Sequence, residues 1–426
     1  MKHLEHRKKN AGMISLLLLF QIIGMTACGE AVTETEQESY NMTVVENIPD
    51  VSYNEPTMTP NILVDQQGYD TDGRKQAVVK GSEQAETFRL IDQETGETVY
   101  EDTVRQMEYD EKLELYIGTA DFSEYTGEGE FYLECDGVGR SYAFSITEEH
   151  YQKWLQTLCE ETGDRCRDRS ITGAELVTLL QAYEWYPQVF ADDNDNDIPD
   201  LLEDIAKGLK ESLDDTEEPE KEDLRDVAAL AKFSYLYREY DAQLAEKCLQ
   251  RASAAYGELA DNEDRDADRF LALTELYRVE GRSSYQKQIL EYRDLLEEEL
   301  ADPEDAAYLY GAMTYMSTRR SVDMDLCSVL METIRKRSEE LAKQWNRESA
   351  MTSGDYKTAE LLRQAEEMAC ANYVSYSYQY TEILEDALHY LMGQNRDSVD
   401  YFSEREKGDA ADYLLLIAQQ VSLLED

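Results

Sequence analysis

Short segments in which apolar and polar residues alternate run through residues 60–148. Turn sequences such as Asp72-Gly73 and Asp136-Gly137 separate them. Alternation with a period of two, interrupted by turns at this spacing, is typical of strands in a two-sheet β domain. We therefore predict an immunoglobulin-like β-sandwich over residues 60–148. The predicted strands are Asn61–Asp65, Gln76–Lys80, Thr87–Ile91, Glu97–Tyr100, Leu113–Ile117, Gly129–Glu134 and Ser141–Ile146.

From residue 150 to residue 426 the apolar residues recur at helical spacing. Leu224, Val227, Ala228 and Ala231 are one such run, which places them on one face of a helix. Pro and Gly are scarce, at 7 and 21 residues, which also favours helix. No tetratricopeptide-type repeat is visible, so many helices joined by short loops predict an α/α toroid or solenoid. The predicted helices are 150–160, 174–186, 199–213, 222–239, 241–260, 264–280, 284–299, 303–317, 321–345, 354–372, 376–392 and 408–424.

The first residues carry a different pattern, in which basic residues precede the apolar run Ala11–Ala27 and then Cys28. A short apolar core that ends in small residues before a cysteine resembles a bacterial lipoprotein signal, in which Cys28 is lipidated. The alternative is an uncleaved N-terminal membrane helix. On the first interpretation, residues 1–27 are the signal peptide and the acidic residues 28–59 form a flexible stalk. The protein would then be exported and lipid-anchored at the bacterial cell surface.

Acidic residues dominate the charge of the chain, with 92 Asp and Glu against 41 Lys and Arg and a net charge of −51. Such a chain repels phosphate backbones, which excludes nucleic-acid binding by a basic groove. The acidic surface agrees either with solubility alone or with weak binding of divalent cations. The cysteines after Cys28 are scattered and lack zinc spacing. Cys159 and Cys166 either form a disulfide or, like the others, are small core residues.

Several stretches follow one another in order along residues 60–395. In the predicted sandwich they are Ile62–Tyr69, Lys75–Val79, Asp121–Ser123, Gly129–Leu133 and Ser141–Ile146, and in the helical part Leu179–Glu184, Asn196–Glu203, Tyr240–Leu249, Glu275–Arg278 and His389–Asn395. This series resembles glycoside hydrolase family 9, the cellulase family with an N-terminal immunoglobulin-like module. The resemblance implies an (α/α)6-type helical toroid over residues 150–426. It also implies a β-1,4-glucan or related plant polysaccharide as partner.

Members of that family invert the anomeric carbon with two carboxyl functions, a base that activates water and a protonated Glu that assists the leaving oxygen. By this resemblance, Asp164 in Glu161-Thr162-Gly163-Asp164 corresponds to the base, and Glu161 replaces the Asp that helps to hold the water. Asp168 is a second candidate. The alternative for this segment is a polar loop between helices without a catalytic role. Glu406 is the best-placed acid candidate before the last helix, ahead of Glu404, or else it is a surface residue.

The acid side departs from the family pattern, because Arg396–Lys407 contains neither a His-x-Arg clamp nor an Asn-Glu pair. A base without an acid loses most glycosidase catalysis, since unassisted departure of an alkoxide is slow. The sequence therefore favours a degenerate relative with a glycan-binding or accessory role. Two alternatives stay open. One is an active inverting endo-β-1,4-glucanase that hydrolyses O-glycosyl bonds, and the other is a cell-envelope lipoprotein that binds protein partners.

Two further sets of residues are candidates for ligand contact. Trp185 and Tyr186, at the end of a predicted helix, either line a carbohydrate cleft or belong to the core. Asp193, Asp195 and Asp197 alternate with Asn and resemble a calcium loop, although the Gly of an EF-hand is missing at its sixth position. Acidic residues before a helix are also favourable without a metal. Calcium is thus a possible ligand, and no cofactor is required.

Overall fold

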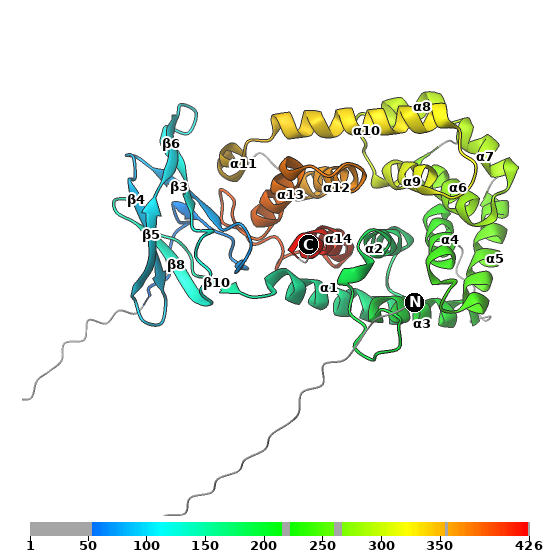
Figure 1. The fold of residues 1–426 in the computed structure, drawn as a ribbon, viewed down its shortest axis with the longest axis horizontal. Helices are drawn as coiled ribbons and strands as arrows, with labels where there is room; N and C mark the ends of the chain where they lie inside the picture. The colour runs from blue at the N-terminus through cyan, green and yellow to red at the C-terminus, as the bar shows by residue number, and fades with distance from the viewer. Residues whose placement is uncertain (1–52, 215–221, 260–265, 354–356, 425–426) are drawn as a thin grey trace, which may run out of the picture. The chain divides into compact units, whose positions relative to one another are not determined.

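The structure is a computed structural model that describes residues 53–214, 222–259, 266–353 and 357–424. The described strands lie between Ile62 and Thr147, and the described α-helices lie between His150 and Leu424 (Figure 1). The predicted β-sandwich followed by a helical toroid is therefore confirmed. The predicted signal peptide, Cys28 and most of the predicted stalk lie outside the described residues. Within the described ranges, no helix has the length and apolar character needed to cross a membrane.

Two sheets share one core in the N-terminal domain. One has the strand order β1-β3-β7-β6, and the other has the order β2-β10-β8-β4-β5 with β9 paired to β8. Ala77 and Ala120 of the first sheet and Phe88, Phe131 and Phe144 of the second are buried in the same cluster. The strands are β1 (Ile62–Leu63), β2 (Tyr69–Asp70), β3 (Gln76–Gly81), β4 (Thr87–Asp92), β5 (Thr98–Thr103), β6 (Arg105–Asp110), β7 (Leu115–Asp121), β8 (Gly129–Cys135), β9 (Gly139–Arg140) and β10 (Phe144–Thr147).

The helices form an inner ring and an outer layer. The inner helices α2, α4, α6, α9, α12 and α14 contact one another in a closed ring, in which α14 returns to α2. In Figure 1, α2 and α14 lie in the middle, with α1 and α3 below and α10 along the top. The helices are α1 (His150–Arg167), α2 (Gly173–Trp185), α3 (Asp200–Asp214), α4 (Leu224–Tyr237), α5 (Ala242–Leu259), α6 (Ala267–Glu280), α7 (Ser283–Leu290), α8 (Arg293–Glu299), α9 (Ala306–Ser317), α10 (Met324–Gln344), α11 (Arg347–Ser353), α12 (Thr358–Val374), α13 (Tyr378–Leu391) and α14 (Ala410–Leu424).

One or two outer helices lie between successive inner helices along the chain and return it, so the inner helices start at one common end of the ring. Oxygen-bearing side chains cap four of these starts. Thr172 caps α2, Asp223 caps α4, Asp266 caps α6 and Asp305 caps α9, each by accepting a backbone N–H of the first turn. A helix N-terminus carries partial positive charge, which favours carboxylates there. This end of the ring therefore gathers acidic residues.

Helix α1 is longer than its apolar spacing predicts. The prediction ends at residue 160, whereas α1 continues to Arg167, so Glu161 and Asp164 lie on a helix and not in a loop. Helix α3 crosses the end of α1 so closely that a Cβ on Gly208 would lie 2.0 Å from the carbonyl oxygen of Cys166. This close crossing supports the last turn of α1, which contains few apolar residues of its own.

The possible disulfide between Cys159 and Cys166 is wrong, since both thiols are free. The two residues are two turns apart on α1, which separates their Cα atoms by about 10 Å. A disulfide spans at most about 7 Å between Cα atoms. Burial raises the pKa of each thiol to about 12, so both behave as small core residues. Elsewhere, the predicted helix 284–299 is divided into α7 and α8, and α11 is not predicted.

Two of the stretches that resemble family 9 meet at the joint between the β-sandwich and the helices. Oδ2 of Asp65 lies 2.7 Å from Nδ1 of His389, and both side chains are buried. Gln394 donates hydrogen bonds to the carbonyl oxygens of Leu63 at 3.1 Å and Gln76 at 2.6 Å. Burial raises the pKa of Asp65 and lowers the pKa of His389, so both groups are favoured in their neutral forms. These matching stretches therefore have a structural role in joining the domains.

Candidate functional site

The two segments that the family resemblance assigns to catalysis lie side by side. Helix α1, which carries Glu161 and Asp164, packs on α14, and the segment with Glu406 immediately precedes α14. Arg405 forms an ion pair with Glu161, and Arg165 donates a hydrogen bond to the carbonyl oxygen of Lys407 at 2.6 Å. The structure thus brings the predicted base and acid segments to the end of the ring where α2 and α14 begin.

Asp164, the predicted base, is a surface carboxylate on α1. Its side chain is 71% exposed and forms an ion pair with Arg167, which also pairs with Asp204 of α3. The second candidate, Asp168, is the exposed C-cap of the same helix. An exposed carboxylate beside an arginine three residues away is a common stabilising surface pair and needs no catalytic role.

Gly163, which completes the resemblance to the family's base segment, has a packing role here. It is buried in α1, and a Cβ at this position would lie 2.6 Å from Oδ2 of Asp204 on α3. The absence of a side chain therefore lets α3 approach α1. The match of Glu161-Thr162-Gly163-Asp164 to the family segment is thus compatible with a helix crossing alone.

Two arginines occupy the junction between the segments. Arg165 donates to both carboxylate oxygens of Glu175, at 2.5 and 2.9 Å, as well as to the carbonyl oxygen of Lys407. Arg405, from the other segment, forms an ion pair with Glu161 through one nitrogen. An inverting pair of carboxyl groups stands about 6.5–9.5 Å apart with room for water and sugar between them. Here guanidinium groups link the two segments directly. Glu406 itself is exposed, and no side-chain cap hydrogen bond holds it.

Two carboxyl groups that the sequence did not single out lie at the same end of the ring, one buried (Glu366) and one half-buried (Asp412). Glu366 of α12 and Asp412 of α14 hydrogen-bond to each other, and the Tyr310 hydroxyl of α9 lies 3.2 Å from Oε1 of Glu366. Burial raises the pKa of Asp412 to about 7 and raises that of Glu366 well above its usual range, with further repulsion from Asp409 and Glu175 on Asp412. At neutral pH these two carboxyls therefore hold a proton between them.

Buried ion pairs fill the inside of the ring between α2, α4 and α6. Lys232 donates to Gln181 at 2.9 Å, to Glu184 at 2.5 Å and to Glu275 at 3.2 Å. Arg278 pairs with Glu184 and Glu275. Burial opposes the ionisation of Glu184, but Lys232 and Arg278 outweigh it and lower its pKa to about 2. These fixed charges stabilise one another, and they leave the ring interior occupied by protein.

Trp185 and Tyr186 lie at the opposite end of α2 from the arginine junction. The helix rises about 1.5 Å per residue, so Trp185 is about 18 Å from the start of α2 at Gly173. Both side chains are buried. Trp185 stacks on Tyr373 of α12, with ring centroids 5.0 Å apart and an interplanar angle of 20°. The two aromatic residues thus do not line a common site with Asp164 and Glu161.

The predicted calcium loop is held by hydrogen bonds among its own residues. Asp192 accepts the backbone N–H groups of Asn196 and Asp197, and the Asn194 and Asn196 amides donate to Glu203 at 2.8 Å. Within the described ranges, no group of three His, Cys, Asp or Glu is arranged to hold a metal ion. The carboxylates of Asp193, Asp195 and Asp197 are exposed, and calcium at this loop stays a prediction.

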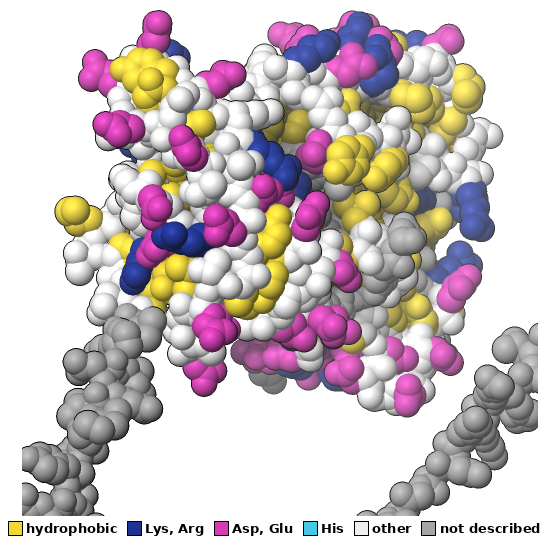
Figure 2. All heavy atoms as spheres, turned by 60° about the vertical axis from the view of Figure 1, so that its left-hand side comes forward, with side chains coloured by type: hydrophobic (Ala, Val, Ile, Leu, Met, Phe, Trp, Pro, Cys, Tyr) yellow, Lys and Arg dark blue, Asp and Glu magenta, His cyan; other side chains and the backbone are white. Residues whose placement is uncertain are grey.

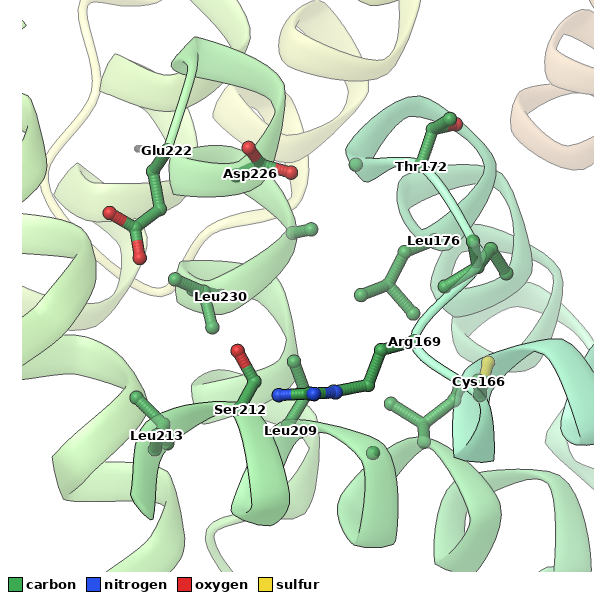
Figure 3. Close-up of a pocket in the computed structure, with 15 residues that line it drawn as sticks. Cys166, Arg169, Thr172, Leu176, Leu209, Ser212, Leu213, Glu222, Asp226 and Leu230 are labelled. Carbon is green, nitrogen blue, oxygen red and sulfur yellow. The ribbon is translucent and has the colours of Figure 1, made fainter. Parts of the chain in front are cut away.

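Four cavities of the described part of the chain are not lined by Glu161, Asp164 or Glu406. One of about 120 Å³ lies among α1, α2, α3 and α4, where Arg169 extends toward Ser212 of α3 and Asp226 lies on the far side (Figure 3). It is smaller than the roughly 300–1,000 Å³ typical of ligand pockets. A larger open groove of about 420 Å³ lies between the β domain and α11, where Tyr109 and Asn346 are among the lining residues.

The comparisons with known proteins agree with this architecture. The family described as cellulase N-terminal ig-like domain matches residues 57–140. A metagenome-derived glycoside hydrolase family 9 endoglucanase is 19% identical with a TM-score of 0.66, over 80% of this chain and 84% of that one. A thermostable endoglucanase from Alicyclobacillus acidocaldarius is 16% identical with a TM-score of 0.60, over 81% and 84%. AaCel9A in complex with cellobiose-like isofagomine is 17% identical with a TM-score of 0.60, over 80% and 84%. No curated protein sequence matches the chain.

The chain therefore has the fold of the family 9 endoglucanases, an immunoglobulin-like module followed by a helical toroid. The resemblance stated from the sequence is confirmed at this level. Because the identities are below 20%, the similarity shows a shared fold but does not show a shared catalytic activity.

Proposed function

We propose that this protein binds β-glucan without hydrolysing it, as a degenerate relative of the family 9 endoglucanases. The observation that carries the proposal is the pair of arginine contacts at the predicted catalytic segments. Arg165 and Arg405 connect α1 to the segment before α14, and these are the two segments to which the family resemblance assigns the base and the acid. Hydrolysis would require room for water between those two carboxyl groups. The cellulase-type fold supports a glucan as ligand, and the closed junction supports binding in place of turnover.

The proposal includes export and a lipid anchor on Cys28. An anchored glucan-binding protein would retain polysaccharide or its fragments at the cell surface for other proteins to act on. The signal-like sequence before Cys28 is what supports this part. Labelling of the expressed chain with a radioactive or alkyne-tagged fatty acid tests it, since Cys28→Ser should abolish incorporation if Cys28 is the acceptor.

Native affinity electrophoresis tests glucan binding. The full chain is run in gels with and without neutral polysaccharides, namely mixed-linkage β-glucan, hydroxyethyl cellulose and xyloglucan. Neutral polymers are needed because a chain with net charge −51 is repelled by carboxymethyl cellulose. Migration is measured relative to an acidic reference protein in each gel. We expect the protein to migrate more slowly in at least one glucan gel than in the gel without polysaccharide. Equal migration in all gels would refute the proposal and direct attention to protein partners.

A further inference from the structure

Exposed tyrosines follow the end of α12, at the opposite end of the ring from the arginine junction. Tyr373 is 46% exposed, and Tyr376 and Tyr378 are each 66% exposed. We call these three residues the tyrosine surface. They lie on the last turn of α12, the connection to α13 and the first residue of α13. Exposed aromatic rings within six residues of sequence expose apolar area to water, which favours covering them with a ligand.

The backbone beneath the tyrosine surface is fixed. The Asn372 side chain is buried and accepts the backbone N–H of Ser377 at 2.8 Å, which holds the connection between α12 and α13. The backbone N–H of Ser375 donates to the carbonyl oxygen of Ala371 at 2.9 Å. Trp185 supports the ring of Tyr373 by stacking on it. Tyrosines on a fixed backbone contribute contact area with little loss of conformational freedom on binding.

The segment that carries the tyrosine surface is uncharged, unlike the rest of the chain. Residues 368–381 contain no Asp, Glu, Lys or Arg, although 31% of the whole chain is charged. Acidic side chains are spread over the face of the molecule shown in Figure 2. A charged partner would be matched by complementary charge, which this segment lacks. Its exposed groups are instead phenol rings, hydroxyls and amides, which suit a neutral ligand with apolar faces and many hydroxyl groups.

A neutral glucan chain has this chemistry, since the C–H groups of each ring form apolar faces and its hydroxyls form hydrogen bonds. We propose that the tyrosine surface is the glucan-binding site of this protein, with Tyr376 and Tyr378 stacking on sugar rings and Tyr373 extending the contact. The proposal rests on the proposed function, because it names the place where the glucan binds. Trp185 has a positioning role, since it is buried beneath Tyr373 and holds that ring.

The test uses affinity electrophoresis of the full chain in the neutral glucan that retards it most, with dissociation constants from migration at several glucan concentrations. The variants are Tyr376→Ala, Tyr378→Ala and the double substitution. The matched control is Tyr109→Ala, which removes a 52% exposed tyrosine from the β domain. We expect each single substitution to weaken binding about 5- to 10-fold, as for loss of an aromatic contact, and the control to leave it unchanged. Tyr376→Trp should restore binding, because it keeps a stacking ring.

The outcomes separate this proposal from the proposed function. If the unaltered chain is not retarded by any glucan, the proposed function fails and this site fails with it. If the unaltered chain is retarded and the double substitution is retarded equally, the site is wrong while glucan binding stands. If Tyr109→Ala loses binding in place of the tyrosine-surface variants, the groove beside α11 is the site and this proposal is overturned. Near-ultraviolet circular dichroism of each variant verifies that its fold is intact.

Discussion

The carboxyl pair of Glu366 and Asp412 makes the stability of this protein depend on pH in a direction that one substitution should remove. Burial raises the pKa of Asp412 from 3.8 to about 7 in the folded protein. Because the folded pKa is above the unfolded one, the folded protein keeps a proton that the unfolded chain releases. The contribution of this group to stability is therefore complete below about pH 4 and is lost as the pH rises through 7.

The magnitude follows from the size of the rise. One pKa unit corresponds to about 1.4 kcal/mol, so ionising Asp412 lowers the free energy of unfolding by about 4 kcal/mol above pH 7. Part of this loss has already occurred at pH 5, because the unfolded carboxyl ionises near pH 4. Asp412→Asn keeps the size of the side chain and a hydrogen-bond donor to Glu366 but cannot ionise. We expect its stability relative to the unaltered chain to rise by about 3 kcal/mol between pH 5 and pH 9.

Urea unfolding at pH 5, 6, 7, 8 and 9, followed by circular dichroism, measures this difference. The pH range stays above the isoelectric point of about 4.3, where the chain would precipitate. Asp164→Asn is the matched control, since it removes the same charge from an exposed position. The free energies of unfolding of Asp412→Asn and the unaltered chain could instead change in parallel with pH, or differ more at low pH than at high pH. Either result would refute a proton held between the two carboxyls.

Three further predictions concern packing and the arginine junction. Gly208→Ala should lower the free energy of unfolding by about 3 kcal/mol in urea titrations, because the new Cβ would meet the backbone of Cys166. A loss below about 0.5 kcal/mol would mean that α1 and α3 can move apart without cost. His389→Ala should lower the free energy of unfolding by about 3 kcal/mol, because Oδ2 of buried Asp65 loses the imidazole that it contacts. An equally stable variant in the same titration would contradict a stabilising role for this contact. Arg165→Ala should destabilise by about 2 kcal/mol and release no reducing sugar from β-glucan, whereas gained hydrolysis would show a competent site beneath the arginine.

The sequence predicts the inner helices well because they are apolar on most sides. Helix α6, for example, spans Ala267–Glu280 against a predicted 264–280. The prediction fails where an element is polar. The edge strand β6, Arg105–Asp110, has only exposed or half-buried residues, and the two apolar residues among its six positions are too few to mark a strand. The end of α1 was missed for a related reason, because it is held by the crossing of α3 at Gly208 and not by an apolar stripe.

The sequence predicted which segments meet at the candidate site, but it did not predict the contacts between them. The resemblance places Glu161 and Glu406 on segments that do meet, but the contacts that link those segments join residues far apart in sequence. Nothing local to Arg165 or Arg405 indicates that each would bridge to the opposite segment. Asp412 carried no distinctive signal, because it lies in the first turn of α14, where a carboxylate is favourable in any helix. Its partner on α12 required the structure.

Absence of glycosidic hydrolysis is the claim on which the proposed function depends most directly. The measurement is reducing-end release from mixed-linkage β-glucan, hydroxyethyl cellulose and xyloglucan by the full chain, in the same preparation that is retarded in the affinity gel, beside Asp164→Asn. We expect retardation without release above the buffer blank for either protein. Release by the unaltered chain that disappears in Asp164→Asn would contradict the proposal and establish an active inverting hydrolase with Asp164 as its base.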